Sequence, residues 1–310
     1  MSTSLRSESH GDEGRAPGGS RAGRLAVHPL AAGDEPEVLA FLAARPLHTV
    51  VMAGFVRDHG LASPLNRGAF YGCRRPGGRL EGVALLGHAT LVEARGEAAL
   101  ARLARLARRL PRPHVIMGEQ EVAGSFWRHY AGDGEEPRLT CRELLFELRR
   151  PAAARRPAGG LRPATPAELD AVMEVQARMA FEECGVDPLE ADPVGFRARC
   201  LRRVERGRVW VLVEGGRLVF KADVIAETPE VIYLEGVHVE AGSRGAGRGL
   251  DCLAQLGRTL LARAGSLCLL VREERTAAHD FYRRAGYEFR GFYDTIYPAR
   301  PGGRRLLGGT

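Results

Sequence analysis

The sequence predicts an α/β protein of the α+β type, in which a mixed, mostly antiparallel central sheet flanked by helices occurs twice. Residues 161–310 give the first observation, because they read as two helices, three strands, and then alternating helices and strands. The second observation is a rougher version of the same order in residues 26–150. Both halves also have a glycine turn between strand-like segments, at Gly78 and at Gly215–Gly216. A degenerate internal duplication accounts for all three observations.

Length and composition favour two folded domains and exclude a membrane-spanning protein. The chain has 310 residues and a hydrophobic fraction of 45%, which suits two globular domains of about 150 residues each. No apolar run approaches the roughly 20 residues that a membrane span needs, so no membrane partner is expected. Residues 1–25 are rich in Gly, Ser and Arg without a hydrophobic core, which predicts a disordered tail rather than a secretory signal.

Cysteines and charges narrow the possible partners. The six cysteines are scattered and form no C-x-x-C pair, so we expect buried free thiols, no metal site and a reducing, cytoplasmic location. The net charge of +7 comes almost entirely from arginine, and the arginines are spread among acidic residues instead of forming one basic block. A nucleic-acid partner is therefore not indicated. A positive net charge still attracts an anionic cofactor.

The first half, residues 26–150, is expected to fold as one domain. Its periodic segments predict, in order, a strand at 26–31, a helix at 34–44, a hairpin or longer meander at 69–94, a helix at 97–110, a strand at 113–118, a helix at 121–131 and a strand at 139–149. Residues 151–160 then combine Pro, Ala, Gly and Arg without apolar periodicity, which is typical of a linker.

The second half, residues 161–310, begins with a clear helix signal. Thr165 and Glu168 match a capping box, and Pro166 occupies the first helical position. A second helix is expected after Asp192. The remaining segments predict strands at 208–214, 217–225 and 230–239, a helix from 250 to 264, a strand at 267–271, a helix at 277–285 and a strand at 287–297.

A glycine-rich stretch, "AGSRGAGRG" at residues 241–249, lies between the predicted strand at 230–239 and the helix that follows. A helix N-terminus presents free backbone N–H groups and a partial positive charge, which favour an anion. Gly245, Gly247 and Gly249 lack the Cβ atoms that would keep a phosphate away from this backbone. No Lys-Ser or Lys-Thr follows, as a P-loop requires, and the sheet context does not suit a dinucleotide motif. The stretch therefore predicts a site for a diphosphate-like group.

With this loop in place, residues 161–297 resemble the GNAT N-acetyltransferase fold. The acyl-CoA motif of that family, Arg/Gln-x-x-Gly-x-Gly/Ala, is matched by Arg244, Gly247 and Gly249. The whole chain also resembles bacterial tandem-GNAT proteins with a degenerate N-terminal half. The resemblance implies acetyl-CoA as acyl donor, bound by Val237, His238, Val239, Arg244, Gly245, Ala246, Gly247, Arg248, Gly249 and Arg275.

The resemblance further implies an N-acetyltransferase that moves an acetyl group from acetyl-CoA to a primary amine by direct attack in a ternary complex. Glu235, on the strand before the glycine loop, is the candidate base that removes the ammonium proton. His238 is a weaker candidate, because strand alternation places it on the opposite sheet face unless a bulge intervenes. Tyr282, in a segment similar to the second motif of the family, is the candidate acid that protonates the leaving thiolate. The acceptor is a small-molecule or peptide amine whose identity stays open.

Several alternatives remain open at the level of sequence. Arg275 stands where the family commonly has Asn, and it either reaches a CoA phosphate or is solvated. Lys221 and Asp223 either line the acceptor site or form a surface pair. The first half has only Gly96 where the second has its glycine loop, so we expect one acyl-CoA site per chain. The competing function is a non-catalytic acyl-CoA-binding sensor or scaffold, and the chain is expected to be a monomer or homodimer.

Overall fold

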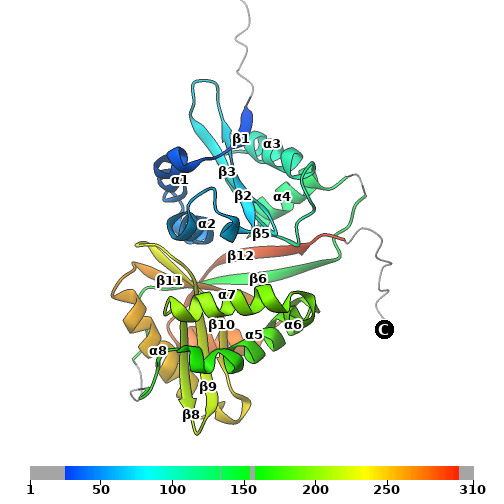
Figure 1. The fold of residues 1–310 in the computed structure, drawn as a ribbon. Coiled ribbons are helices and arrows are strands. Elements are labelled where there is room, and N and C mark those ends of the chain that lie inside the picture. Colours follow the sequence, from blue (N-terminus) through cyan, green and yellow to red (C-terminus); the bar gives the residue numbers. More distant parts are fainter. Residues whose placement is uncertain (1–24, 133, 154–157, 300–310) are drawn as a thin grey trace, which may run out of the picture.

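The computed structural model describes residues 25–132, 134–153 and 158–299. Strands β6 (Leu139–Leu148) and β12 (Glu288–Tyr297) run across the middle of the molecule, with the other elements of the first half on one side and those of the second half on the other (Figure 1). Almost all of the tail predicted at 1–25, and the middle of the linker predicted at 151–160, lie outside the described residues. Among the helices described, none combines the length and hydropathy needed to cross a membrane.

The strands form one continuous mixed sheet with the order β1-β2-β3-β4-β5-β12-β6-β11-β10-β9-β8-β7. Two neighbouring pairs are parallel, β4 with β5 and β10 with β11, and the other neighbours in the described sheet are antiparallel. The remaining strands are β1 Ala26–Pro29, β2 Gly68–Arg74, β3 Leu80–Gly87, β4 Ala89–Ala94, β5 Val115–Glu119, β7 Arg162–Pro163, β8 Val209–Glu214, β9 Arg217–Glu227, β10 Val231–Val239 and β11 Ser266–Arg272.

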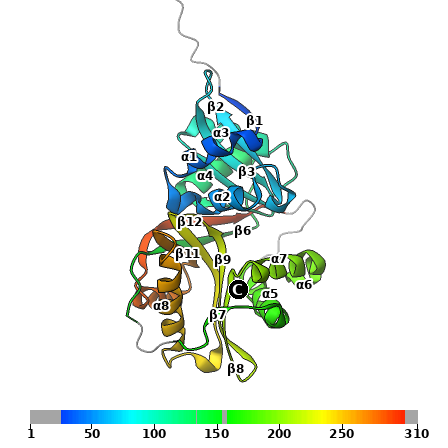
Figure 2. The same ribbon diagram turned by 60° about the vertical axis from the view of Figure 1, so that its left-hand side comes forward.

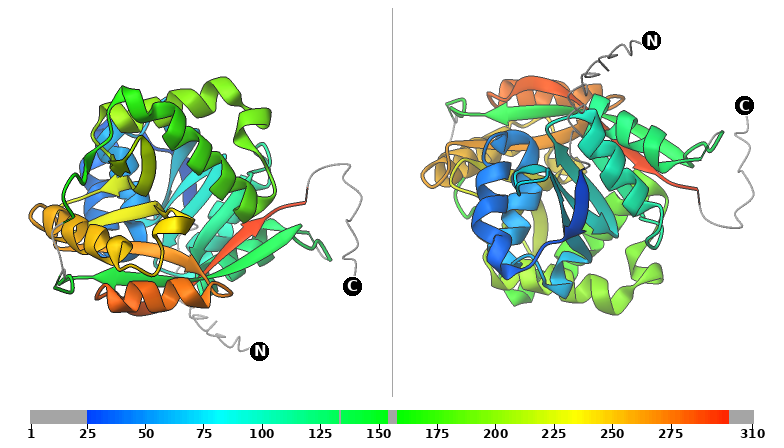
Figure 3. Two further views of the ribbon diagram at one scale, coloured as in Figure 1. Left: turned by 90° about the horizontal axis from the view of Figure 1, so that it is seen from below. Right: turned by 90° about the horizontal axis from the view of Figure 1, so that it is seen from above.

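Helices cover both faces of this sheet in each half. The α helices are α1 Glu35–Leu42, α2 Pro46–His59, α3 Glu97–Ala107, α4 Gln120–Tyr130, α5 Leu169–Cys184, α6 Pro188–Ala191, α7 Pro193–Glu205, α8 Arg248–Leu261 and α9 Thr276–Arg284. In the second half, α8 lies on one side of β8 and β9, and α5 and α7 lie on the other (Figure 2). In the first half, α1 and α2 flank the strands opposite α3 and α4 (Figure 3, right). Separate apolar cores fill these layers.

The last strand of each half lies next to strands of the other half. β12 is inserted between β5 and β6, and β6 in turn pairs with β11. When the strands of each half are matched in chain order, the sheet order reads the same from both edges. The two parallel pairs are also equivalent under this match. The predicted duplication is therefore present, and the halves are related by a pseudo-twofold axis between β6 and β12.

Local signals placed most elements correctly. The carboxylate of Glu168 accepts the Thr165 backbone N–H at 2.7 Å, as the capping box requires. Asp192 accepts the Gly195 N–H at 3.0 Å and begins α7 where the second helix was expected. The meander predicted at 69–94 consists of β2, β3 and β4.

Helix α2 has no counterpart in the sequence prediction. Its buried side chains are spread around the helix instead of forming one stripe, so the usual helical periodicity is weak. The reason is that α2 packs on strands of both halves, including β9 and β10. Contact with β9 is close, because a Cβ at Gly54 would lie 2.7 Å from the Cβ of Ala226.

Candidate active site

Strands β10 and β11 separate just before the candidate catalytic residues. They are paired at 231–233 and 266–268, although β10 continues to Val239 and β11 to Arg272. An open pocket of about 690 Å³ begins at this separation and is bounded by the end of β10, the glycine loop, and the first turns of α8 and α9. The predicted site residues that line it are Val237, Val239, Arg244, Gly245, Ala246, Gly247, Gly249, Arg275 and Tyr282.

The glycine loop has the backbone conformation that the sequence suggested. Gly245 and Gly247 have φ values of +82° and +83°, in the left-handed region that favours glycine. A Cβ at either position would meet nothing within 4 Å, so protein atoms leave the space in front of this backbone free. Gly247 is the N-cap of α8, and the N–H groups of the first helical turn follow it. The loop can therefore present backbone donors to an anion in the pocket.

Gly249 lines the pocket and also serves packing, a role that the sequence did not predict for it. It is buried, and a Cβ there would lie 2.7 Å from Val239 Cγ2 and 3.3 Å from Phe281 Cε2. The small residue lets α8 approach β10 and α9 closely. Gly249, the last glycine of the motif, thus allows the elements that form the pocket wall to pack closely.

The three predicted arginines occupy different positions. Arg244 lines the pocket, and its Nε donates to the Val239 carbonyl at 3.0 Å. Arg275 also lines the pocket, with its Nη2 3.8 Å from a carboxylate oxygen of Glu182. Arg248 forms an ion pair with Glu214 and is not among the residues that line the pocket. Two of the three arginines can therefore face a bound anion.

Tyr282 lies at the wall of the pocket, on the α8–α9 side of the sheet. Its side chain is 9% exposed and packs against the rings of Phe146, Phe281 and Tyr287. Burial raises the pKa of its hydroxyl well above the usual value. The group stays protonated at neutral pH, as a proton donor must.

A β-bulge in β10 changes the prediction for His238. Glu235 pairs with Asp223 and His238 pairs with Lys221, so three steps along β10 match two steps along β9. Gly236, at the extra position, has φ +60°. The bulge therefore places His238 on the same sheet face as Glu235, the case that strict alternation would exclude. Burial, with the charges of Arg178 and Arg244 adding to it, lowers the pKa of His238 to about 4, so its imidazole is neutral at pH 7.

Lys221 and Asp223 form a buried ion pair, so the surface-pair alternative is wrong. Their side chains are 0% and 1% exposed, and Lys221 Nζ lies 2.8 Å from Asp223 Oδ1. The same ammonium donates to Gln176 Oε1 at 2.8 Å and to the Gly236 carbonyl at 3.4 Å. The pair thus connects the bulge of β10 to α5 and holds the backbone next to Glu235 in position.

Glu183, which the sequence did not single out, opposes the ionisation of both Glu235 and Glu143. The Glu235 side chain is reached by water, yet surrounding protein desolvates it and the Glu183 charge opposes its ionisation. Together they raise the pKa of Glu235 to about 7. Burial also raises the pKa of Glu183, on α5, and of Glu143, on β6. No local motif marks these two residues, because α5 packs on β10 and β6 pairs with β11 only in the tertiary fold.

The first half has a glutamate at the position equivalent to Glu235. β4 and β5 pair at 89–91 and 115–117, in the same register as β10 and β11, which makes Glu93 the counterpart of Glu235. β4 then ends at Ala94, and α3 begins at Glu97. No segment of comparable length to the glycine loop connects them.

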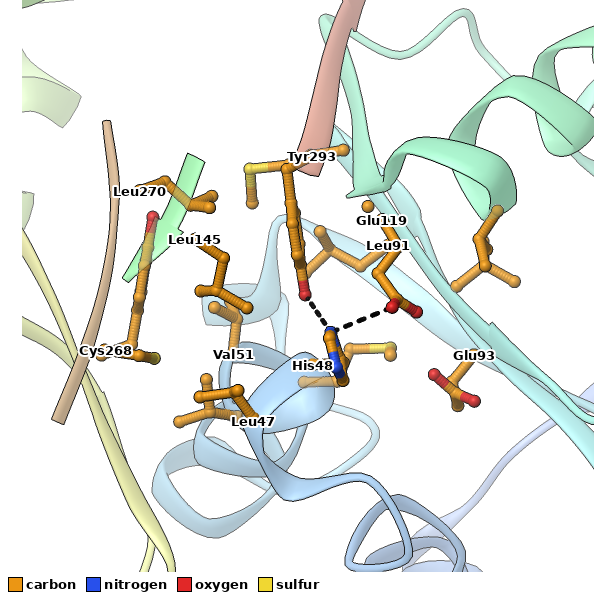
Figure 4. Close-up of a pocket in the computed structure, with 17 residues that line it drawn as sticks. Leu47, His48, Val51, Leu91, Glu93, Glu119, Leu145, Cys268, Leu270 and Tyr293 are labelled. Atoms are coloured by element: carbon orange, nitrogen blue, oxygen red, sulfur yellow. Dashed lines mark hydrogen bonds and ion pairs between the residues drawn. The ribbon is translucent and has the colours of Figure 1, made fainter. Parts of the chain in front are cut away.

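Side chains occupy this equivalent position in the first half. Arg45 pairs with both Glu93 and Glu119, and His48 Nδ1 lies 2.8 Å from the Tyr293 hydroxyl and 3.5 Å from Glu119. Figure 4 shows His48 between the Tyr293 and Glu119 side chains, at the edge of a cavity otherwise lined mainly by apolar residues. The cavity has a volume of only about 40 Å³. The space is far smaller than the pocket of the second half.

Solved structures of similar fold support a tandem arrangement of two GNAT-like halves. A GCN5-related N-acetyltransferase from Sphaerobacter thermophilus has a TM-score of 0.59 at 18% identity, over 90% of this chain and 97% of that chain. A GNAT-family acetyltransferase from Colwellia psychrerythraea has a TM-score of 0.56 at 13% identity, over 88% and 100%. A tandem GNAT protein from the clavulanic acid biosynthesis pathway has a TM-score of 0.54 at 18% identity, over 90% and 100%. No protein-family model and no curated protein matches the sequence. The chain has the tandem GNAT fold.

Proposed function

We propose that this protein is an acetyl-CoA-dependent N-acetyltransferase of the cytoplasm, which transfers an acetyl group to a primary amine of a small-molecule or peptide acceptor by direct attack in a ternary complex. The observation that supports this best is the early end of the β10–β11 pairing beside the glycine loop. The edge of residues 234–239 that would face β11 has no strand pairing there, so an extended amide-containing arm can pair along it.

The donor is proposed to lie in the pocket of about 690 Å³. Backbone N–H groups at the start of α8 hold the diphosphate, and Arg244 and Arg275 add positive charge at its rim. The bound donor supplies the thioester whose carbonyl the amine attacks. Val237 and Val239 lie along the same wall, where the backbone of β10 positions the arm.

The two candidate catalytic residues supply opposite proton transfers. Glu235 removes a proton from the ammonium group of the acceptor, for which its pKa of about 7 is well suited near neutral pH. The neutral amine forms the new C–N bond as the C–S bond breaks. Tyr282 then protonates the departing thiolate from the α8–α9 side, since its hydroxyl is held in the protonated form.

The acceptor is proposed to approach from the face that carries Glu235, Glu183 and Glu143. A protonated amine is attracted by these carboxylates, and its positive charge in turn favours their ionised forms. Glu143 belongs to β6, so the first half contributes directly to the acceptor side. This gives the half without a glycine loop a role in binding.

Turnover with a panel of amines tests the proposal. Acetyl-CoA is mixed with the protein and mono-, di- and polyamines, amino acids or peptides, and released CoA thiol is measured with a chromogenic disulfide. We expect turnover with at least one amine, and slower turnover in Glu235→Gln at neutral pH. Binding of acetyl-CoA without turnover of any amine would instead favour the sensor or scaffold function.

A further inference from the structure

A second large pocket lies in the first half, away from the glycine loop. Its volume is about 660 Å³, and it is formed by the start of β2, the turn between β3 and β4, the segment before β5 and the residues that follow β12. It shares no lining residue with the pocket at the glycine loop. Arg67, Arg112 and Arg138 line it, and none of the described lining residues carries a carboxylate.

The positive charge of this pocket is only partly balanced. Arg112 pairs with Glu135 at 2.7 Å and donates to the Ala299 carbonyl at 2.7 Å. Arg138 lies over the ring of Tyr297, with its Cζ 5.3 Å from the ring centroid. Within the described ranges, neither Arg67 nor Arg138 has a carboxylate within ion-pair distance. Neither guanidinium group therefore has a carboxylate in direct contact, and the nearby Asp192 charge acts on Arg67 only from beyond that distance.

Arg67 is held in place at an energetic cost. It has φ +54°, the one positive φ among non-glycine residues in the described part of the chain. The paired strands β2 and β3 approach closely at this end, since a Cβ at Gly87 would lie 2.3 Å from the Arg67 carbonyl oxygen. Burial and the nearby Arg199 charge lower the pKa of Arg67, and together they outweigh the opposing effect of the Asp192 carboxylate. A strained backbone, and a guanidinium group without a carboxylate in contact, are typical of a binding site.

Two histidines form a flat wall beside these arginines. The rings of His88 and His114 stack with centroids 4.8 Å apart and planes within 9°. Burial, together with the neighbouring Arg67 and His114, lowers the pKa of His88 to about 4, so its ring is uncharged at neutral pH. A neutral imidazole ring adds an N–H donor without adding a positive charge that would need a counter-ion. An uncharged donor next to guanidinium groups suits the several oxygens of a phosphate group.

We propose that this pocket binds a small phosphate-bearing anion through Arg67 and Arg138, at a site separate from the donor pocket. Guanidinium groups bind phosphate oxygens with paired, charge-assisted hydrogen bonds, and both arginines line the pocket. The volume exceeds the need of a phosphate group alone, so the ligand carries a further organic part against the wall formed by His88 and His114. This proposal does not depend on acetyl transfer.

Calorimetric titration of the full-length protein with inorganic pyrophosphate tests it. Asn tolerates the left-handed conformation, so Arg67→Asn removes the charge and keeps the backbone, which a thermal melt verifies. We expect its pyrophosphate affinity to fall at least about tenfold, since a hydrogen-bonded charge is lost. Arg105→Gln, at an exposed arginine of α3, removes the same charge elsewhere and should bind like wild type.

Arg244→Gln controls for binding at the glycine loop. Heat of pyrophosphate binding that is missing in Arg244→Gln is assigned to the glycine loop. Heat of binding that is missing in Arg67→Asn but present in Arg244→Gln is assigned to the second pocket. The proposal is overturned if folded Arg67→Asn binds pyrophosphate like wild type. It is also overturned if wild type shows no Arg244-independent binding up to low millimolar pyrophosphate.

Discussion

Replacement of Gly247 by glutamate separates the backbone role of the glycine loop from its role in binding an anion. The φ of +83° at this position costs any L-residue about 1–2 kcal/mol. A Cβ meets no protein atom within 4 Å, so no clash adds to this cost. Gly247→Ala is therefore the matched control, because it carries the same backbone strain without the charge.

The expected loss of affinity follows from the geometry of the loop. In Gly247→Glu the carboxylate occupies the space in front of the N–H groups of α8, where the diphosphate is proposed to lie. Two like charges about 4 Å apart at an effective dielectric constant of about 20 repel by about 4 kcal/mol. That energy corresponds to about a thousandfold weaker binding. Both variants should lose only a few degrees of melting temperature.

Titration calorimetry with acetyl-CoA and a thermal melt of each variant measure the two effects. We expect Gly247→Ala to bind within about tenfold of wild type, since its strain acts on folding more than on binding. We expect Gly247→Glu to melt like Gly247→Ala and to show no measurable binding. If the two variants bind acetyl-CoA equally well, the diphosphate does not lie at this loop.

Four further predictions address the site. Tyr282→Phe should lower kcat by roughly ten- to a thousandfold at nearly unchanged affinity for CoA, and normal turnover in steady-state kinetics would leave the tyrosine only a packing role. In wild type, kcat/KM should rise with pH through about 7 as Glu235 ionises. Glu235→Gln should be slower than wild type, by a factor that shrinks at high pH, where the amine deprotonates unaided. A deficit that does not change with pH would contradict the assignment of Glu235 as the base. Calorimetry should find one acetyl-CoA per chain, and a stoichiometry of two would show that the first half binds it as well. Gly249→Ala should reduce the free energy of unfolding by about 1–3 kcal/mol in urea titrations, because its Cβ would overlap Val239 at 2.7 Å; an unchanged midpoint would refute the packing role.

The sequence predicted those parts of the structure that depend on local signals. The capping box at Thr165 and Glu168, the glycine turn at 215–216 and the glycine loop each place a particular backbone geometry within a few residues. The pocket that the loop lines is formed by these local features together with one sheet. For the same reason, most of the residues predicted for the donor line that pocket.

The features that the prediction missed depend on distant parts of the chain. Strand alternation cannot reveal the bulge at Gly236, because it is stabilised by Lys221 of the neighbouring strand and Gln176 of α5. Helix α2 was not predicted, because both halves bury it and its helical periodicity is therefore weak. Likewise, Glu143 joins the acceptor side only through the pairing of β6 with β11. Strand propensity indicates that a segment pairs, and it does not indicate with which partner.

The position of β12 also determines when the sheet can be completed during synthesis. The strand at 288–297 leaves the ribosome after every other described strand, yet it fills the middle of the sheet between β5 and β6. Until then, the edges of β5 and β6 that it will cover are unpaired, and open edges promote pairing with other chains. The first half therefore reaches its final form only after the second has been made. Nascent chains that pause before β12 are the species most exposed to aggregation, and the cell must complete or protect them.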